Sequence, residues 1–392
     1  MGALPEPRAK GGIRPVKPRI ALFAILFAGL AVGVLPALAP APAVAQAPAT
    51  KKDAGKKGEV RVQGQRLTEN GKASSPGPSA AVVDLREEMR KFVQSAAAYA
   101  RQQRPDFAVV VEGGLDLLVK ADEVDKLNVA PAHAYMRSID GVIVPGLFFD
   151  KPDKPGAEPT PEKLAARLAL LEYARAARLK IMTVDFVADA DQAQAAIQRS
   201  AEKGFIPFPA TRPIPYLNAL PRVPARPYRE NGESVISFPG VRNFMIMGDS
   251  RPFGREDEYA LALHDTNFDA LIVDVFHGRQ PLSRQAVETL KYKKLGAKRL
   301  VLARIDLSSI AAGSFFWKQG WREGYPNFVD APMAGDPDRH WVQYWRSNWQ
   351  RIVTGNEDSY LFGVMGQGFD GVVLAGLDAY RHFEGGPKDE EQ

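Results

Sequence analysis

The sequence contains no cysteine. This absence excludes a lipid anchor on cysteine, a structural disulfide and a thiol nucleophile together, so folding depends on packing alone. The few histidines are scattered along the chain and lack the close spacing of a zinc or iron site; they are His133, His264, His277, His340 and His382. We therefore expect neither a metal nor another cofactor.

Several functional motifs are also missing. No glycine-rich phosphate-binding turn follows an apolar run, and no Gly-x-Ser-x-Gly pattern indicates a serine hydrolase. The formal net charge is +5, but much of the positive excess lies within residues 1–70. Because no basic stripe interleaved with aromatic residues follows that segment, we expect no nucleic-acid partner.

The amino-terminal segment, residues 1–45, has the pattern of an export signal. A basic stretch ending at Arg19 precedes an apolar run over residues 20–38, and small residues at 43–45 provide a cleavage site. The apolar run is long enough that an uncleaved membrane anchor is the alternative. Both interpretations predict a secreted or periplasmic protein that contacts a membrane only through such an anchor.

The rest of the chain divides by composition. Residues 46–80 are rich in proline, alanine and lysine and are predicted to be a disordered linker, and residues 386–392 form an acidic tail. Between these segments, short apolar runs alternate with amphipathic stretches, which indicates an α/β fold with a parallel sheet. The expected helices include residues 86–103 and residues 160–178, the second opened by a Thr-Pro-Glu capping pattern.

Eight apolar runs are predicted to be strands, and eight is the number that closes a (β/α)8 TIM barrel. A doubly wound open sheet is the competing architecture. If the barrel forms, the run at 244–247 should pair in parallel with those at 205–208 and 270–274, and the run at 107–111 should pair with that at 371–374. The predicted strands are residues 107–111, 141–144, 180–185, 205–208, 244–247, 270–274, 299–304 and 371–374.

Two groups of motifs occur in a recognisable order. The later group contains NFDALIVD from residue 267, LVLA from 300, VQYW from 342 and GFDGVVL from 368, and the earlier group contains EMRKFV from 88, RPDF from 104, VDF from 184 and GFIPF from 204. Together they resemble the two halves of the endo-α-1,4-polygalactosaminidase-like family of glycoside hydrolases. The resemblance covers most of the chain after the linker.

In typical members of that family the order of the two halves is reversed. The resemblance therefore implies a circularly permuted barrel. Residues 81–210 correspond to the family's second half and residues 241–385 to its first half, and the proline-rich residues 211–240 connect them. Permutation is compatible with a barrel because the first and last strands are neighbours.

The resemblance implies a hydrolase of an amino-sugar polysaccharide, and glycoside hydrolysis uses two carboxyl groups. The chain departs from the family where the acids are expected. Ser308-Ser309-Ile310-Ala311 replaces a Gly-Glu-Ala-Glu turn, and Ala375 replaces an aspartate. Two functions therefore remain open: a glycoside hydrolase, and a catalytically inactive barrel that binds a glycan or another envelope component.

In barrel enzymes the chemistry lies at the carboxyl ends of the strands. The candidate catalytic residues there are Asp274, Asp185, Asp306 and Glu112. The candidate substrate-binding residues are Asp249, Arg251, Trp317, Trp321 and Asp378. Aspartates at strand ends also cap helices, so a structural role is the alternative for each of them.

All the tryptophans lie in one long gap before the last strand. Trp341, Trp345 and Trp349 recur every four residues, which predicts one helix face packed on the barrel. Trp317 and Trp321 are suited either to packing or to stacking on sugar rings, and both interpretations stay open.

Overall fold

The structure is a computed structural model that describes residues 83–121 and 128–385. The predicted export signal or anchor, the linker and the acidic tail lie outside the described residues. Within the described ranges, no helix is long and apolar enough to cross a membrane.

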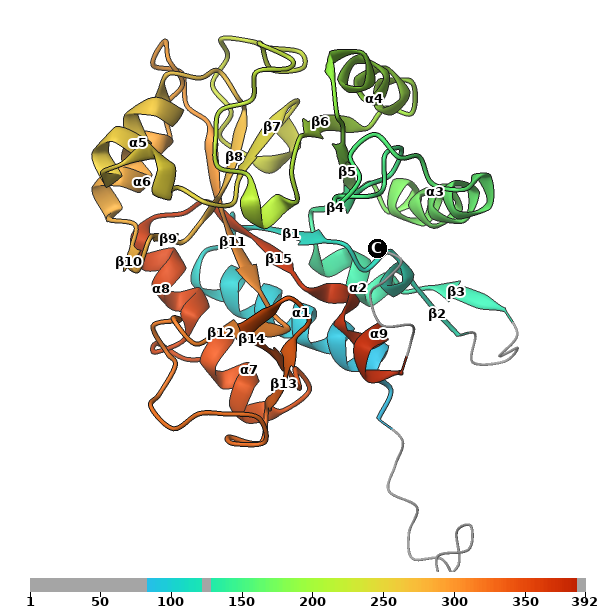
Figure 1. Ribbon diagram of the computed structural model, residues 1–392, viewed down its shortest axis with the longest axis vertical. Helices are drawn as coiled ribbons and strands as arrows, with labels where there is room; N and C mark the ends of the chain where they lie inside the picture. Colours follow the sequence, from blue (N-terminus) through green and yellow to red (C-terminus); the bar gives the residue numbers. More distant parts are fainter. Residues whose placement is uncertain (1–82, 122–127, 386–392) are drawn as a thin grey trace, which may run out of the picture. The chain divides into compact units, whose positions relative to one another are not determined.

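The core is a sheet of eight parallel strands in the order β6-β5-β4-β1-β15-β11-β8-β7. The eight predicted strands and the α/β class are confirmed, with bounds that shift by two residues at most, and the sheet curls into a nearly closed barrel consistent with a TIM barrel (Figure 1). The strands are β1 (Ala108–Glu112), β4 (Gly141–Pro145), β5 (Lys180–Phe186), β6 (Ile206–Ala210), β7 (Phe244–Met247), β8 (Ala270–Asp274), β11 (Leu300–Asp306) and β15 (Gly371–Ala375).

The strands are almost continuously apolar because a parallel sheet covered by helices is buried on both faces. Val109, Leu271 and Val301, from three different strands, are fully buried. The predicted pairing of β1 with β15 is confirmed, with Ala108 aligned with Gly371. At Gly371 a Cβ atom would lie 2.5 Å from the carbonyl oxygen of Ala108, so glycine permits the close approach of these strands.

The predicted closure between β6 and β7 is wrong in its detail. β7 pairs with β8 as predicted, but no hydrogen-bonded ladder joins β7 to β6 in the described chain. Proline has no N–H group to donate, and Pro207 and Pro209 both lie in β6, as expected for a strand at an edge. The rings of Phe208 and Phe244, 5.5 Å apart, pack across this junction instead.

Helices surround the sheet, with α3 and α4 beside β4 to β6 and α5 and α6 beside β7 and β8 (Figure 1). Five of them, α1, α3, α4, α6 and α8, begin at side-chain caps. In α1 the Asp84 carboxylate accepts from the Glu87 N–H, and in α3 Thr160 caps the predicted Thr-Pro-Glu helix. The helices are α1 (Leu85–Gln103), α2 (His133–Ser138), α3 (Pro161–Ala176), α4 (Ala190–Glu202), α5 (Glu256–His264), α6 (Arg284–Leu290), α7 (Ser347–Val353), α8 (Tyr360–Gln367) and α9 (Tyr380–Phe383).

The long gap before β15 contains a small antiparallel sheet of β12 (Ser309–Ala311), β13 (Val329–Met333) and β14 (Asp336–Val342). The predicted tryptophan helix face is wrong. Trp341 lies in β14, Trp345 in a turn and Trp349 in α7. The spacing of four arises because a strand, a turn and a helix follow each other in close succession.

Short elements complete the chain. Two further hairpins are formed by β2 (Val119–Ala121) with β3 (Val129–Pro131) and by β9 (Phe276–His277) with β10 (Gln280–Pro281). The short 3-10 helices are η1 (Leu115–Leu118), η2 (Ile214–Tyr216), η3 (Phe238–Gly240), η4 (Arg251–Phe253) and η5 (Leu377–Ala379).

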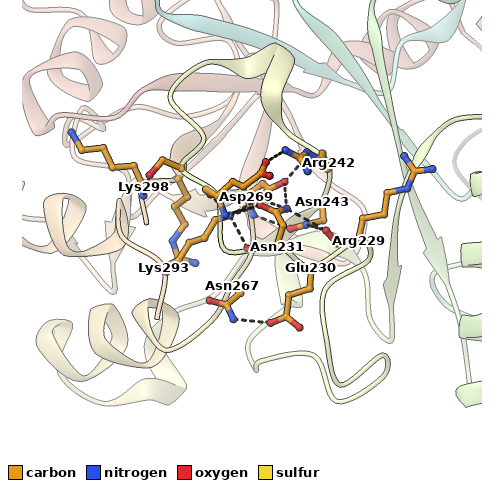
Figure 2. A network of polar contacts seen from close by, with 12 residues as sticks. Arg229, Glu230, Asn231, Arg242, Asn243, Asn267, Asp269, Lys293 and Lys298 are labelled. Atoms are coloured by element: carbon orange, nitrogen blue, oxygen red, sulfur yellow. Dashed lines mark hydrogen bonds and ion pairs between the residues drawn. The ribbon is translucent and has the colours of Figure 1, made fainter. Parts of the chain in front are cut away.

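The proline-rich connector, residues 211–240, is fastened to the barrel by a buried ion pair (Figure 2). Lys293 Nζ lies 2.6 Å from Asp269 Oδ1, and both side chains are completely buried. The same ammonium donates to the backbone carbonyls of Asn231 and Glu233 in the connector. Because Asp269 directly precedes β8, the connector is held at the amino-terminal end of the strands.

Candidate functional site

Two neighbouring cavities lie at the carboxyl ends of the strands, the end that we call the mouth. The first mouth cavity has a volume of about 620 Å³ and includes Glu112 and Asp378 in its wall. The second has about 590 Å³ and includes Asp274 and Asp249. Asp306 lines both, together with Ser309 and Met333. The acids that the sequence analysis selected, except Asp185, are therefore divided between two adjacent cavities.

Glu112, at the end of β1, is held by Arg304 of β11. Two hydrogen bonds of 2.7 Å run from the guanidinium Nε and Nη2 to the two carboxylate oxygens. Burial alone would lower the pKa of Arg304, but the charge and hydrogen bonds of Glu112 raise it above its usual value. This bidentate pair engages both oxygens of Glu112 with one donor each and fixes the carboxylate against Arg304.

Asp306, at the end of β11, is occupied by the turn that follows it. Its Oδ1 accepts from the N–H and hydroxyl of Ser308 and from the N–H of Ser309, and its Oδ2 accepts from the Ser309 hydroxyl at 2.7 Å. Arg339 Nη1 in turn donates to Ser309 Oγ at 2.9 Å. The two serines that follow this strand thus serve as donors to the Asp306 carboxylate.

Asp274, at the end of β8, is the least engaged of the mouth acids. Its Oδ1 accepts one hydrogen bond, from the N–H of Phe276 at 2.9 Å. Burial raises the pKa of Asp274, while the Phe276 N–H and the nearby Arg304 and Arg339 partly oppose that rise. Tyr360 lines the same cavity, and burial together with the charges of Asp274 and Asp306 raises the pKa of this tyrosine. A carboxyl group whose neutral form is favoured can act as a proton donor.

Asp185, at the end of β5, lines neither mouth cavity. It is almost completely buried, and its Oδ1 accepts from the N–H groups of Phe148 and Phe149 at 2.6 and 3.0 Å. Burial raises the pKa of Asp185 to about 6, although both N–H groups favour the ionised form. Its contacts order the loop that follows β4.

Of the predicted substrate-binding residues, Asp249 and Arg251 line the second cavity as an exposed bidentate pair, with distances of 2.8 and 3.0 Å. The hydrogen bonds from Arg251 lower the pKa of Asp249. Asp378 lines the first cavity and accepts from the Gly114 N–H at 2.9 Å. Burial raises the pKa of Asp378. Gly113 has φ of 76°, and a Cβ atom there would lie 2.3 Å from Asp378 Oδ2, so glycine leaves room for this carboxylate.

The tryptophans are divided between packing and the cavities. Trp317 and Trp321 contact each other edge to face with ring centroids 5.7 Å apart, and they line neither mouth cavity. Trp341 lines the first cavity and stacks on His382, with centroids 4.6 Å apart and planes 14° apart. Its place in β14 turns this ring toward the mouth.

Two residues in the wall of the first cavity were not found from the sequence. Asp150 pairs with Lys163 at 2.8 Å, while its Oδ1 is buried and has no hydrogen-bond partner. Arg167 of α3 donates to the backbone carbonyls of Pro145 and Gly146, at the end of β4. The position of Asp150, directly after the apolar run at the end of β4, was an available signal. Nothing in the helical pattern of α3 distinguishes Arg167 from a surface arginine.

Among the acids of the two cavities, Asp274 and Asp306 differ from the rest. Every other acidic side chain in the two walls forms an ion pair with lysine or arginine. Asp306 accepts four hydrogen bonds instead, so only Asp274 is neither paired nor saturated. In residues 83–121 and 128–385, no group of three or more histidines and acids is placed to hold a metal ion.

No protein-family profile matches the chain. It is similar to an uncharacterized protein of Thermotoga maritima, with 23% identity over 31% of this chain and 36% of that protein. It is also similar to an uncharacterized protein of Deinococcus radiodurans, with 27% identity over 32% of this chain and 38% of that protein. An uncharacterized protein of Methanocaldococcus jannaschii is 26% identical over 32% of this chain and 35% of that protein. The chain therefore spans little more than a third of the length of these relatives, and the similarity connects it to proteins without an assigned activity.

Proposed function

We propose that this protein is a secreted or periplasmic barrel that binds an amino-sugar polysaccharide at its mouth without efficient hydrolysis. One observation carries the proposal: Asp274 is the only acid in the two cavities that is neither ion-paired nor saturated by hydrogen bonds. Glycoside hydrolysis uses two carboxyl groups on either side of one bond. Because the mouth has a single available carboxyl group, it lacks the second carboxyl group that efficient hydrolysis requires.

The charge and the aromatic groups of the mouth support a glycan ligand that carries ammonium groups. In the first cavity, acidic side chains outnumber lysine and arginine by five to three. Trp341 lines that cavity, and Tyr216 and Phe315 line the second cavity with more than half of their surface exposed. Flat aromatic rings stack on sugar rings, and carboxylates attract the ammonium groups of a deacetylated amino sugar. The resemblance to the polygalactosaminidase-like family supports the same class of ligand.

A slow hydrolase is the second candidate function. Asp274 and Asp306 end neighbouring strands and line the same cavity. Burial raises the pKa of Asp274, which gives it the character of a general acid, and Asp306 is the only candidate base or nucleophile beside it. Hydrolysis by this pair would require Asp306 to give up donors from Ser308 and Ser309.

The test uses the purified chain with a partly deacetylated galactosamine polymer and its fully N-acetylated form. We expect calorimetric binding of the deacetylated polymer and no release of reducing ends above the background. Asp274→Asn should weaken binding by no more than about threefold, because the acidic excess lies in the first cavity and Asp274 lines only the second. The control Asp265→Asn, an exposed acid outside the mouth, should leave binding unchanged. Release of reducing ends by the native chain that Asp274→Asn abolishes would establish the hydrolase instead, and absence of binding to both polymers would refute the proposal.

A further inference from the structure

The base of the barrel, at the amino-terminal ends of the strands, contains a third cavity, which we call the base cavity. It has a volume of about 790 Å³ and lies at the beginnings of β4, β5, β6 and β7. Seven lysine and arginine side chains line it with a single acid, Asp140. Asp140 is already paired with Arg101 at 2.8 Å. The wall of the base cavity therefore carries a net positive charge, in contrast to the acidic first mouth cavity.

Two of the arginines in this wall have an unusual backbone conformation. Arg178 has φ of 61° and Arg229 has φ of 48°, and within the described ranges no other residue except glycine has a positive φ. Both line the base cavity. A left-handed backbone costs free energy in any residue with a Cβ atom and favours glycine. The chain nevertheless has arginine at both positions.

The two helices beside the base cavity provide an internal comparison. α3 ends with Arg178 in the left-handed conformation, and Leu179 N donates back to Ala174 O at 2.9 Å. α4 ends in the same way, with Gly204 at φ of 75° and Phe205 N donating to Ser200 O at 2.9 Å. Glycine therefore satisfies this helix end without strain. The arginine at the end of α3 suggests a role for its side chain that the helix end itself does not require.

Arg229 is held in its strained conformation by two amides. Its carbonyl oxygen accepts from Asn231 Nδ2 at 3.2 Å and from Asn243 Nδ2 at 3.4 Å. Figure 2 shows its side chain extending away from the buried pair of Asp269 and Lys293. The network fixes the backbone and leaves the guanidinium outside it.

Interaction with helix ends explains part of the positive charge. Arg137, Arg175 and Lys203 lie at the carboxyl ends of α2, α3 and α4, where cations are favourable. This explanation does not apply to Arg229, which comes from the connector. In the part of the chain that the structure describes, Arg137, Arg178, Lys203 and Arg229 form no ion pair with an acid.

We propose that the base cavity binds a soluble ligand that carries several phosphate groups. A guanidinium matches a phosphate with two parallel hydrogen bonds, and the four cations without acidic partners are available for such bonds. The site is concave and its cations come from several elements, which suits a compact polyanion better than the flat surface of a bilayer. None of its residues lines a mouth cavity, so the proposal is independent of the glycan site.

Inorganic tripolyphosphate is the probe, titrated calorimetrically into the full chain. Arg178→Gly and Arg229→Gly should each weaken its binding at least fivefold, and the double variant at least twentyfold, because each removes a charge-assisted contact. Both variants relieve backbone strain, so the Tm should stay constant or rise by about 2 °C. A purely structural role for these arginines predicts unchanged affinity. The combination of equal or higher stability with lower affinity therefore identifies a binding role.

The control is Lys151→Gln combined with Lys154→Gln, which removes two exposed positive charges in the loop after β4, outside the base cavity. This variant should keep the affinity for tripolyphosphate within twofold. If this control variant loses as much affinity as the double arginine variant, net charge alone explains the binding and the proposal is overturned. Absence of tripolyphosphate binding by the native chain would also overturn the proposal. If the native chain instead binds vesicles that contain an anionic phospholipid, the ligand is a membrane surface and the proposal of a soluble ligand is wrong.

Discussion

The carboxylate of Glu112 on β1 and the guanidinium of Arg304 on β11 are joined by two hydrogen bonds of 2.7 Å across β15, the strand that separates them. The ring of strands makes this contact short although the residues are 192 positions apart in the sequence. Ala375 of β15 lies in register with Asp306 and has no polar group with which to compete for either partner. At the end of β15 this chain therefore has an alanine between the two partners of an internal ion pair.

The first prediction concerns the stability of this pair. Glu112→Ala should reduce the free energy of unfolding by about 3 kcal/mol, because it leaves the largely buried Arg304 without its partner. Asp249→Ala is the control, because its partner Arg251 is exposed and such pairs contribute about 0–1 kcal/mol. Urea unfolding of both variants provides the measurement. Equal losses in the two variants would contradict the prediction.

The second prediction concerns the pH dependence that Asp185 causes. Burial raises its pKa in the folded protein to about 6, above the value near 3.9 of an unfolded chain. Between these values the folded state binds more protons than the unfolded state, so the contribution of Asp185 to stability decreases as pH rises from about 4 to 6. Above pH 6 Asp185 is ionised in the folded and the unfolded states, and the decrease in the free energy of unfolding that it causes is complete.

Asp185→Asn removes this charge, and its amide oxygen can still accept from the N–H groups of Phe148 and Phe149. The variant should exceed the native protein in free energy of unfolding by about 1–3 kcal/mol at pH 7 and match it near pH 4. Urea unfolding at each pH gives the comparison. A variant that is less stable at pH 7 would show that the ionised carboxylate is favourable in the fold.

The third prediction concerns the fully buried pair of Lys293 and Asp269. Lys293→Met should cost about 3–5 kcal/mol, because Asp269 then remains buried without its cation and the connector loses the hydrogen bonds from the ammonium. Combining it with Asp269→Asn should recover a large part of this loss, since no unpaired charge then remains. Limited proteolysis should cut residues 211–240 faster in both variants than in the native protein, because neither variant keeps the ammonium that binds the connector. Cleavage of both variants at the native rate would speak against this attachment.

The strands could be predicted from the sequence because each is an apolar run that a parallel sheet buries on both faces. The opening between β6 and β7 was missed because the pattern of Phe205 to Phe208 resembles that of a central strand; Pro207 and Pro209 contained the signal. The mouth acids could be placed because they follow strands. The cationic partner of Glu112, Arg304, could not be placed, because ion pairs across a barrel depend on strand order rather than on sequence spacing.

The fourth prediction distinguishes Trp341, which the sequence predicted to pack, from Trp321, for which the sequence left packing and sugar stacking open. Trp341 lines the first mouth cavity, whereas Trp321 packs on Phe328 and Trp317 and lines neither cavity. Trp341→Ala should weaken binding of the deacetylated galactosamine polymer about tenfold, because a stacking ring is lost. Trp321→Ala should lower the Tm while the remaining folded protein binds with unchanged affinity. Loss of affinity in Trp321→Ala without loss in Trp341→Ala would place the sugar platform at Trp317 and Trp321 instead.

The last prediction restores the missing acids. Ser309→Glu removes the hydroxyl that donates to Asp306 Oδ2, and Ala375→Asp places a carboxylate beside Asp306 in register. The double variant should therefore release reducing ends from the deacetylated polymer at least tenfold faster than the native chain, because general acid or base assistance contributes about 10² to 10⁴ in rate. Adding Asp274→Asn should remove the gain, since Asp274 is the available proton donor in the second cavity.

The control is Ala375→Asp alone, which leaves the Ser309 donor on Asp306 and should stay near the native rate. A folded double variant that binds the polymer and releases no reducing ends would show that the mouth lacks more than carboxylates.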